Sequence, residues 1–327
     1  MKTGISIIIC CYNSERIISR CLQHLFNQET DPNLQWEIIL VNNNCTDNTE
    51  KIAQELFKKH PHIESKIIIE NKPGLAFART KGIQNAQYSY VIFCDDDNLL
   101  CKNYIQTAYS IINSDNTIGA CGGMGIGEFE TPPSPIIQRM QDCYALGSQE
   151  KNISFLYGAG ICIRKEIYDR IINYKYPLFL NGRTGNQLLA GDDSEICKWI
   201  ILMGYKLKSS NYLTFKHVIP KNRLDIKYFK KMLQGFGYAA PILKVYDIQI
   251  KQYDFFYIQL YVIKIILELI KTAIIYTINP QSYGDMYFRY CILKGYYYWG
   301  YKYLKKTYKQ ISSIINAPNF KVLNECK

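Results

Sequence analysis

Apolar residues follow two alternating patterns along residues 1–120. Short continuous runs rich in Ile, Val, Phe and Cys are separated by longer segments in which apolar residues recur every three or four positions. The runs predict buried strands, and the periodic segments predict amphipathic helices. Because the two alternate, the pattern is typical of parallel βαβ units. We therefore expect an α/β fold with a mostly parallel sheet and flanking helices.

The predicted elements of this region come in a regular order. Strands are predicted at residues 5–10, 36–41, 66–70 and 90–94, and helices at residues 15–26, 47–57 and 75–86. Asp47, with Glu50 three residues later, resembles the capping box with which many helices begin. The polar segments that follow the strands would lie at their carboxyl ends, which is where ligands bind in open α/β sheets.

After residue 123 the alternation weakens. A strand is predicted at residues 157–163, a helix at 164–172, a Gly- and Asn-rich loop at 181–191 and a helix from Asp193 to about Met203. The glycine-rich stretch 122–129 lacks the spacing of a dinucleotide-binding loop, and we interpret it as backbone that needs room near a substrate. From Asp225 onward the pattern is mostly helical. We predict a first domain at residues 1–222 and a helical region at residues 223–327.

Residues 255–278 are the most apolar of the helical segments. Gln259, Lys264, Glu268 and Lys271 interrupt the segment, and the last three share one helix face. Its longest uncharged run is shorter than the ~18–20 residues that span a bilayer, so no transmembrane helix is predicted. The segment is expected either to pack on the core or to lie in a membrane interface.

Charge is distributed unevenly along the chain, whose net charge is +11. Residues 1–203 contain 19 basic and 22 acidic side chains, whereas residues 204–327 contain 20 basic and 6 acidic ones, a net charge of +14. Lysines in the second part are interleaved with Tyr, Ile and Leu, which favours an anionic membrane surface over nucleic acid as the partner. The alternative is a solvated face over an aromatic core.

The cysteines indicate the expected compartment. Twelve cysteines occur without C-x-x-C pairs or zinc-ligand spacing, so we interpret them as reduced and mostly buried, as in a cytosolic protein. The opening segment has a short apolar run cut off by Glu15 and Arg16, which predicts a strand and not a signal peptide. We expect a cytoplasmic protein with peripheral contact to the inner face of the cell membrane as an option.

Three consecutive carboxylates end the strand predicted at residues 90–94. Asp95, Asp96 and Asp97 would repel one another if they were left alone away from water. A divalent cation such as Mg²⁺ or Mn²⁺ reverses that effect, since it prefers oxygen ligands and also binds diphosphate. The cluster therefore predicts a metal and a phosphorylated ligand. The alternative is a solvated turn that caps a following helix.

Six segments in the same order resemble a known family. They are SIIICCYNSE, WEIILVNNNCTDNTE, ENKPGLAFARTKGIQNA, VIFCDDDN, YGAGICIRKEIY and AGDDSEICKWIILMGYKL, and together they cover roughly residues 4–220. The set resembles the GT-A glycosyltransferases, and within them family 2, whose members use nucleotide-diphosphate sugars with inversion. The resemblance implies a GT-A fold, Rossmann-like with a mostly parallel sheet, followed here by the helical C-terminal region.

The resemblance also implies roles for individual residues. Donor-binding roles carry over to Tyr12, Asn13, Asn42, Asp47, Arg79, Asp95 and Asp96. Asp97 matches the metal-binding carboxylate of the DxD motif, and His217 lies where these enzymes often supply a histidine to the metal, although a lone histidine in an apolar strand is more often simply packed. Asp193 matches the catalytic base, with a helix N-cap as the alternative. At Asn42 the family usually has an Asp.

These observations predict a metal-dependent inverting glycosyltransferase. It would move a sugar from a nucleotide-diphosphate donor to a glycan or lipid-linked glycan acceptor in surface polysaccharide biosynthesis, with Mn²⁺ or Mg²⁺ as cofactor and no nucleic-acid partner. Two alternatives stay open at this point. One is a non-catalytic nucleotide-sugar-binding protein, and the other is a metal-dependent nucleotidyl or phosphoryl transferase.

Overall fold

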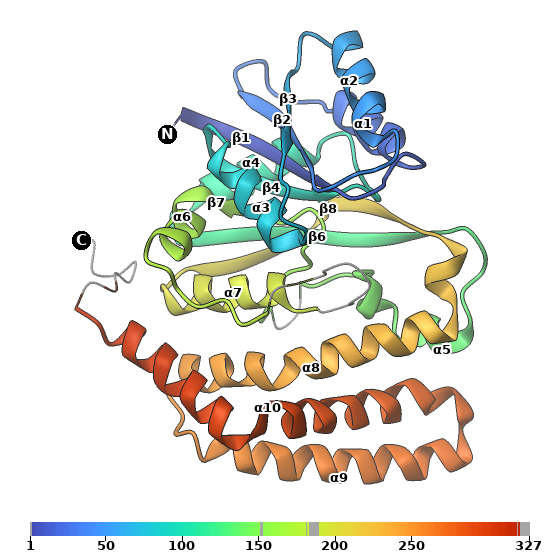
Figure 1. Cartoon of the computed structure of the whole chain (residues 1–327), viewed down its shortest axis with the longest axis vertical. Helices are drawn as coiled ribbons and strands as arrows, with labels where there is room; N and C mark the ends of the chain where they lie inside the picture. The colour runs from blue at the N-terminus through green and yellow to red at the C-terminus, as the bar shows by residue number, and fades with distance from the viewer. Residues whose placement is uncertain (1, 151–152, 181, 183–189, 319, 321–327) are drawn as a thin grey trace. The chain divides into compact units, whose positions relative to one another are not determined.

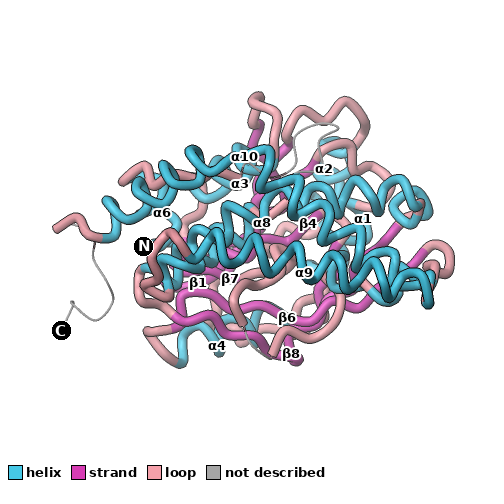
Figure 2. Tube along the Cα trace, turned by 90° about the horizontal axis from the view of Figure 1, so that it is seen from below, coloured by secondary structure: helices cyan, strands magenta, loops and turns pink. Residues whose placement is uncertain are grey.

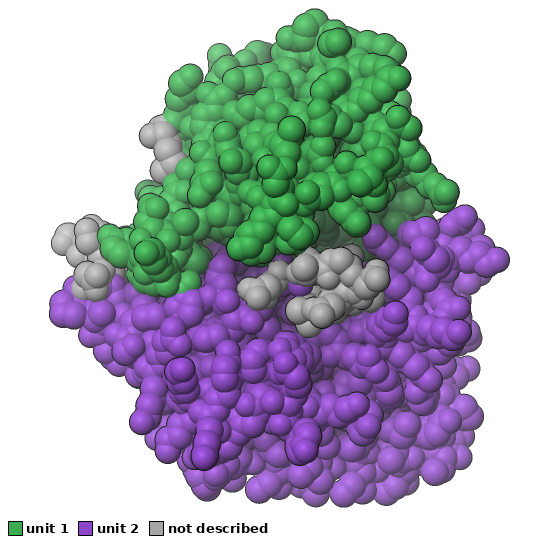
Figure 3. Space-filling model, viewed as in Figure 1, with its two compact units in different colours: residues 1–128, 145–176, 205–219 green, residues 129–144, 177–204, 220–327 purple. Residues whose placement is uncertain are grey.

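The computed structural model describes residues 2–150, 153–180, 182, 190–318 and 320 (Figure 1). The chain divides into two compact units, coloured separately in Figure 3. Unit 1 consists of residues 1–128, 145–176 and 205–219, and unit 2 of residues 129–144, 177–204 and 220–327. The predicted domain boundary after residue 222 stays a prediction. Most of the loop predicted at residues 181–191 lies outside the described residues.

Unit 1 is built on one eight-stranded sheet. The strands are β1 (Lys2–Cys11), β2 (Trp36–Asn42), β3 (Glu64–Ile69), β4 (Tyr88–Asp95), β5 (Asn98–Leu100), β6 (Ile118–Phe129), β7 (Cys162–Arg164) and β8 (Lys206–Ile219), in the order β3-β2-β1-β4-β7-β6-β8-β5. The first four are parallel, β7 is antiparallel to β4 and β6, and β5 is antiparallel to β8. The four strands predicted in residues 1–120 and their parallel pairing are confirmed.

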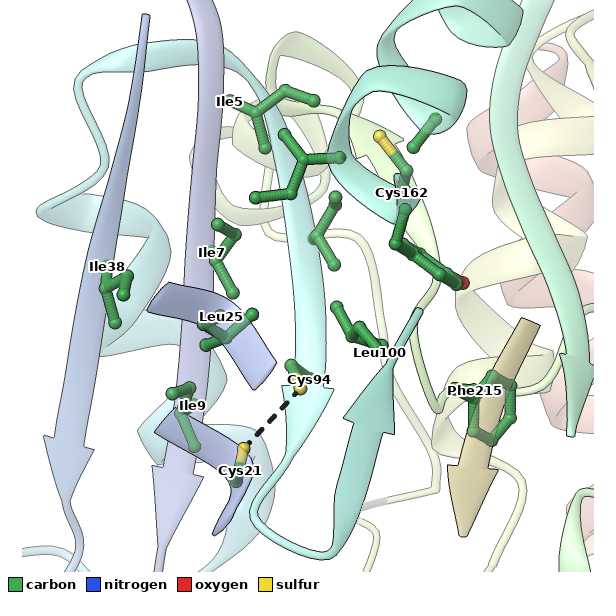
Figure 4. Packing of buried hydrophobic residues seen from close by; sticks show 14 of the residues in the cluster. Ile5, Ile7, Ile9, Cys21, Leu25, Ile38, Cys94, Leu100, Cys162 and Phe215 are labelled. Carbon is green, nitrogen blue, oxygen red and sulfur yellow. Dashed lines mark hydrogen bonds between the residues drawn. The ribbon is translucent and has the colours of Figure 1, made fainter. Parts of the chain in front are cut away.

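Helices cover both faces of this sheet. They are α1 (Ile18–Phe26), α2 (Thr49–Lys59), α3 (Leu75–Gln84), α4 (Tyr104–Ser114) and α6 (Lys165–Asn173). Ile5, Ile7 and Ile9 of β1 pack with Leu25 of α1 and with residues of α4 on one face (Figure 4). On the opposite face, α3 approaches β1 so closely that a Cβ at Gly82 would lie 2.5 Å from Ile8 Cγ2. Alternate side chains of β1 are therefore buried on opposite faces of the sheet.

The glycine-rich stretch 122–129 is part of β6. A Cβ added at Gly123 would lie 1.7 Å from the carbonyl oxygen of Leu213 on β8, and one at Gly125 would lie 1.9 Å from that of Ala145. At Gly123 and Gly125, neighbouring backbone explains the need for room that our interpretation attributed to a nearby substrate. The strand predicted at residues 157–163 is also shorter than expected. Its first residues are irregular because Gly160 takes a positive φ of 74°, so that β7 begins only at Cys162.

Unit 2 is helical. It contains α5 (Pro135–Arg139), α7 (Asp192–Leu202), α8 (Ile226–Ile250), α9 (Tyr257–Ile278) and α10 (Tyr283–Ile315), with short 3₁₀ turns at Gln141–Tyr144, Lys221–Leu224 and Pro280–Ser282. The Asp225 carboxylate caps α8 by accepting a hydrogen bond from the Lys227 N–H at 2.6 Å. The α10 helix lies against both α8 and α9, as the lower part of Figure 1 shows, and it is interrupted at Gly300. The helical character predicted from Asp225 onward is confirmed.

Two further expectations concern the whole chain. Among the described residues, no helix has the length and apolar character needed to cross a bilayer. The described cysteines carry free thiols and most of them are buried, and the thiols of Cys21 and Cys94 lie 3.9 Å apart in the core (Figure 4). The cysteines thus act as small apolar side chains in these positions.

Candidate active site

The acidic triplet forms a tight turn between two strands. Asp95 is the last residue of β4, and β5 begins at Asn98. The Asp95 N–H donates to Asn98 Oδ1 at 3.2 Å, and the Val218 N–H donates to the Asp97 carbonyl at 2.9 Å. A strand and not a helix follows the triplet, so the alternative of a helix cap is wrong. The turn is fixed by its own backbone and by β8, while the carboxylates are left for other contacts.

Strand pairing brings Asp97 and His217 together. In the antiparallel ladder of β5 and β8, Asn98 lies opposite His217. His217 Nε2 is 3.5 Å from Asp97 Oδ2, and each side chain is 12% exposed. Asn98 Nδ2 donates to the other Asp97 oxygen at 3.1 Å and orients the carboxylate. Two residues that are 120 positions apart in the sequence thus form one small, partly buried pair.

The pair meets part of the requirement for a divalent metal. A carboxylate oxygen and an imidazole nitrogen are suitable ligands for Mn²⁺. Among the described residues, however, no group of three or more His, Cys, Asp or Glu side chains is placed to hold an ion. Water and a bound substrate would supply further ligands, as is common for ions that bind diphosphates.

The other two carboxylates of the turn contact one residue that follows β1 and one residue of α3. Ser14 Oγ donates a hydrogen bond to Asp96 Oδ2. Arg79 Nη2 lies 3.9 Å from Asp95 Oδ1, and the Arg79 guanidinium stands 5.0 Å from the centre of the Phe93 ring. Arg79 is largely buried, at 7% exposure. Asp95, Asp96 and Arg79, all predicted as donor-binding residues, therefore lie in one cluster with Ser14, which the prediction missed.

The last residue of β2, Asn42, and the loop that follows it hold two more predicted residues. Asn42 Oδ1 accepts from the Cys45 N–H at 2.8 Å, and Asn42 Nδ2 donates to Glu50 Oε2 at 2.6 Å. Asp47 accepts from the N–H groups of Thr49 and Glu15, both at 3.0 Å. The Thr49 hydroxyl also donates to Asp47 at 2.6 Å. Burial alone would raise the pKa of Asp47, but the bond from this hydroxyl and those from the two N–H groups outweigh burial and lower the pKa. Glu50 bonds Asn42 instead of returning to Asp47, so the predicted capping box is wrong.

The end of β1 contributes Tyr12 and Asn13. Asn13 has a positive φ of 54°, and its Oδ1 accepts from the Thr46 N–H at 2.8 Å, which joins the end of β1 to the loop after β2. Tyr12 is 62% exposed at the same strand end. Asn13 therefore shapes the loop, and Tyr12 presents an accessible ring beside it.

Asn43 is a second residue that the sequence prediction missed. Its Nδ2 donates to the carbonyls of Glu70 at 2.8 Å and Lys72 at 2.7 Å, and its Oδ1 accepts from the Gly74 N–H at 2.8 Å. It uses every hydrogen-bonding group of its amide to hold the turn that precedes α3, the helix of Arg79. The NNN run following Val41 was a signal, but no local pattern distinguishes which Asn is structural.

Unit 2 contains the second acidic motif. The helix α7 begins at Asp192, and its N-cap residue is Gly191, with a positive φ of 95°. Asp193 therefore lies in the first turn of the helix, and the alternative that Asp193 is the N-cap is wrong. Its Oδ1 accepts from the Ser194 N–H at 2.7 Å. The predicted helix from Asp193 to about Met203 is confirmed within one residue at each end.

Glu195 is a buried carboxyl that sequence analysis did not single out. It is fully buried and accepts from the N–H groups of Phe179 and Leu180, each at 2.9 Å, and from the Tyr246 hydroxyl at 2.8 Å. Burial raises the pKa of Glu195 to about 7, although the three hydrogen bonds oppose that shift. Glu195 thus connects α7 with residues 179–180 and with α8. Its position in GDDSE hid this role, because the motif could equally have been a solvated helix start.

Comparisons with known proteins identify the family. Residues 6–172, half of the chain, match the family described as Glycosyl transferase family 2. The chain belongs to glycosyltransferase family 2. It is therefore a glycosyltransferase, and the open alternatives of a non-catalytic binding protein and of a nucleotidyl or phosphoryl transferase are set aside.

Individual relatives extend the match beyond that region. The chain is 33% identical over 250 residues, 73% of each protein, to a dolichyl N-acetyl-alpha-D-glucosaminyl phosphate 3-beta-D-2,3-diacetamido-2,3-dideoxy-beta-D-glucuronosyltransferase of Methanococcus voltae. It is 24% identical to a cholesterol galactosyltransferase of Borreliella burgdorferi, over 80% of this chain and 77% of that one.

A solved structure supports the fold. The mannosyltransferase PcManGT of Pyrobaculum calidifontis, in complex with GDP-Man and Mn²⁺, superposes with a TM-score of 0.61 at 16% identity, over 90% of this chain and 87% of that one. The predicted GT-A fold is confirmed, with flanking helices and a helical C-terminal region. Its sheet is mixed and not mostly parallel: β1 to β4 are parallel, whereas β7 is antiparallel to β4 and β6, and β5 to β8.

Proposed function

We propose that this glycosyltransferase uses a nucleotide-diphosphate sugar and a divalent cation. The observation that carries the proposal is the placement of Asp97 beside His217, at 3.5 Å, in a turn whose other two carboxylates contact Arg79 and Ser14. Asp97 and His217 would fill only part of the coordination sphere of Mn²⁺ or Mg²⁺, and a diphosphate supplies further oxygen ligands. The resemblance in the sequence and the GDP-Man and Mn²⁺ bound by PcManGT support the same proposal.

Each donor-binding residue has a role in this proposal. Arg79 is buried next to Asp95 and would direct a guanidinium toward the nucleotide, where it can make paired hydrogen bonds. Tyr12 offers an exposed ring on which a base can stack. Asn13, Asn42 and Asp47 are hydrogen-bonded within the loops at the ends of β1 and β2, so we propose that they shape the wall around the nucleotide.

We propose inversion at the anomeric carbon, with Asp193 as the base. The acceptor hydroxyl attacks the face opposite the leaving diphosphate and gives its proton to the Asp193 carboxylate. The bound cation would stabilise the negative charge on the departing diphosphate. Asp193 is half-buried in the first turn of α7.

We further propose a lipid-linked glycan as the acceptor and peripheral contact with the cytoplasmic face of a membrane. Two relatives that cover most of this chain are named for lipid-linked or lipid acceptors, a dolichyl phosphate glycan and cholesterol. The basic residues 204–327 support the same location. The resulting product would belong to a surface glycan.

Release of nucleoside diphosphate tests this function. We expect release from one member of a panel of UDP-, GDP- and dTDP-sugars with Mn²⁺ or Mg²⁺, and loss of release with EDTA. Asp193→Asn should slow turnover by roughly 10²–10⁴-fold with donor binding retained, as for loss of a general base. Asp97→Asn should weaken donor binding in the presence of metal but not in its absence.

Asp192→Asn is the matched control, since it removes the neighbouring carboxylate of the same helix turn. It should retain most of the activity. If Asp192→Asn lost turnover while Asp193→Asn kept it, the base would be Asp192 and our assignment of Asp193 would be wrong. Release that continues unchanged with EDTA would contradict the metal requirement.

A further inference from the structure

The α9 helix exposes an unusually apolar side. Seven large apolar residues on it recur every three or four positions and each exposes between 45% and 83% of its surface: Phe256, Leu260, Ile263, Leu267, Ile270, Ile274 and Ile278. We call these seven residues the α9 stripe. Ile258 and Ile265, the buried residues of this helix, lie on the opposite side. Soluble surfaces rarely leave a contiguous apolar strip of this length uncovered, so the stripe calls for an occupant.

Charges next to the α9 stripe indicate the kind of occupant. Lys264 and Lys271 are exposed, and each directly follows a stripe residue in the sequence and lies near the stripe on the helix surface. Along the whole of Tyr257–Ile278, which the structure describes in full, the exposed positions include these two lysines and no acidic side chain. The single acid, Glu268, is half-buried. An apolar stripe accompanied by cations is typical of helices that lie in the headgroup region of an anionic bilayer.

Aromatic side chains stand at both ends of the helix. Tyr253 and Tyr257 stack at 4.3 Å between ring centres at its start, and Tyr276 lies 5.8 Å from Tyr283 near its end. Tyrosine is enriched at membrane–water interfaces, because its ring is apolar and its hydroxyl is polar. Figure 2 shows α9 as one continuous helix, and α9 packs against α10 within unit 2. The exposed side of α9 therefore extends along the surface of unit 2.

A second copy of the chain is the main competing occupant. The spacing of the α9 stripe resembles the seam of a paired helix, in which residues that flank the seam carry opposite charges. Here the exposed flanking charges are both lysines, so a paired copy would supply no exposed carboxylate from α9 to neutralise them. Anionic lipid headgroups would supply that charge along the whole length of the helix.

We propose that α9 docks this enzyme on an anionic lipid surface, with the α9 stripe inserted among the acyl chains near the headgroups and Lys264 and Lys271 on the phosphates. The proposal deepens the membrane contact proposed above by naming the helix and the lipid class. The biological role of this docking rests on the proposed function. Lipid binding itself does not, because it is measured without turnover. Docking of this kind would hold the enzyme where lipid-linked acceptors are found.

Co-sedimentation with vesicles tests the proposal. The full chain should bind vesicles of phosphatidylcholine mixed with phosphatidylglycerol, and should bind vesicles of phosphatidylcholine alone much more weakly. Leu267→Gln combined with Ile270→Gln should reduce the coefficient for partition of the protein into anionic vesicles by about tenfold or more. Two apolar side chains that would insert into the bilayer are replaced by polar ones. Lys264→Glu combined with Lys271→Glu should reduce it at least as much, and added salt should narrow the difference between this variant and the wild type.

Matched controls separate α9 from general surface effects. Ile226→Gln changes an isoleucine of unit 2 that is 43% exposed but lies on α8, and Lys58→Glu with Lys59→Glu reverses two exposed charges on α2. Both should bind vesicles like the wild type. Nucleotide-sugar binding should be unchanged in all of these variants, so a failure of the proposed catalytic function would be recognised separately.

Three outcomes would overturn the proposal. The first is absence of binding to the anionic vesicles, and the second is binding that the α9 variants do not weaken. The third is a protein that does not bind vesicles and is a dimer by light scattering, with the dimer converted to a monomer by Leu267→Gln combined with Ile270→Gln. That result would assign the α9 stripe to a contact with a second copy of the chain.

Discussion

Single side-chain atoms determine the loops around the proposed donor site. The amide of Asn42 accepts from the Cys45 N–H with its oxygen and donates to Glu50 Oε2 with its nitrogen. An Asp at this position, which is the usual residue in the family that the sequence resembles, could accept but not donate. In this chain the Glu50 carboxylate lies beside position 42, so an Asp there would face a second negative charge, whereas Asn can donate to it. The departure at Asn42 is therefore explained by its neighbour.

This pairing gives a prediction at the residue scale. Asn42→Asp should lower the free energy of unfolding by about 1–3 kcal/mol, because two carboxylates would face each other where Asn42 and Glu50 now lie 2.6 Å apart. Asn42→Asp combined with Glu50→Gln should recover most of the lost stability, because the amide at position 50 can then donate to the carboxylate at position 42. Urea unfolding of the two single variants and the double variant measures the coupling. Additive losses in the double variant would show that the two side chains do not interact.

Individual residues of the candidate site were predictable to different degrees. Tyr12, Asp95 and Asp97 could be placed at strand ends because apolar runs show where strands stop. The contact of Ser14 with Asp96 spans 82 positions, and the amide of Asn43 reaches Glu70, Lys72 and Gly74. Contacts of this kind depend on how strands and loops meet in space, so no periodicity in the sequence reveals them.

At the scale of elements, backbone spacing explains the glycines of β6. Gly123 faces the carbonyl of Leu213 on β8 so closely that a methyl group has no space, whereas a Cβ at the neighbouring Gly122 would meet only the Leu156 side chain at 3.3 Å. The two glycines look equivalent in the sequence. Only one of them is required for the approach of two strands.

Gly123→Ala should therefore destabilise unit 1 by about 3 kcal/mol or more, since the backbone of β6 or β8 has to move. Gly122→Ala is the matched control and should cost about 1 kcal/mol or less, because a leucine side chain can shift by a few tenths of an ångström. Thermal or urea unfolding of both variants measures the difference. Equal losses would contradict the account of β6 as a strand whose glycines admit neighbouring backbone.

Most elements followed from the sequence, and the exceptions have physical causes. The parallel strands β1 to β4 are continuous apolar runs because both faces of the sheet are covered. By contrast, five of the twelve residues of β6 are glycine, and the strand was not recognised, since strand propensity reflects side chains that glycine lacks. The short strand β5 was missed because its three residues follow directly on the acidic turn. Pairing with β8, more than 100 positions away, defines it.

For the whole molecule, the buried carboxyl of Glu195 links stability to pH. Burial raises its pKa from 4.5 to about 7 in the folded protein, so the folded state holds a proton between these values that the unfolded chain has released. Stability from this group is therefore complete below about pH 4.5 and falls as the pH rises toward 7, by roughly 3 kcal/mol in all. Above that range both states are ionised and the dependence ends. Tyr246, Asp192 and Tyr303 are titratable groups that interact with it.

Glu195→Gln tests this linkage, because glutamine has a similar shape and does not titrate. The free energy of unfolding of the wild type, measured with urea between about pH 5 and pH 8, should fall relative to that of Glu195→Gln as the pH rises. The variant should be less stable than the wild type at the acidic end, since its amide nitrogen would face one of the N–H groups of Phe179 and Leu180. Glu55→Gln, which removes an exposed carboxylate of α2, should follow the wild type over the whole range. A constant difference between wild type and Glu195→Gln would mean that Glu195 stays ionised when it is buried, with its three hydrogen bonds compensating fully for the loss of water.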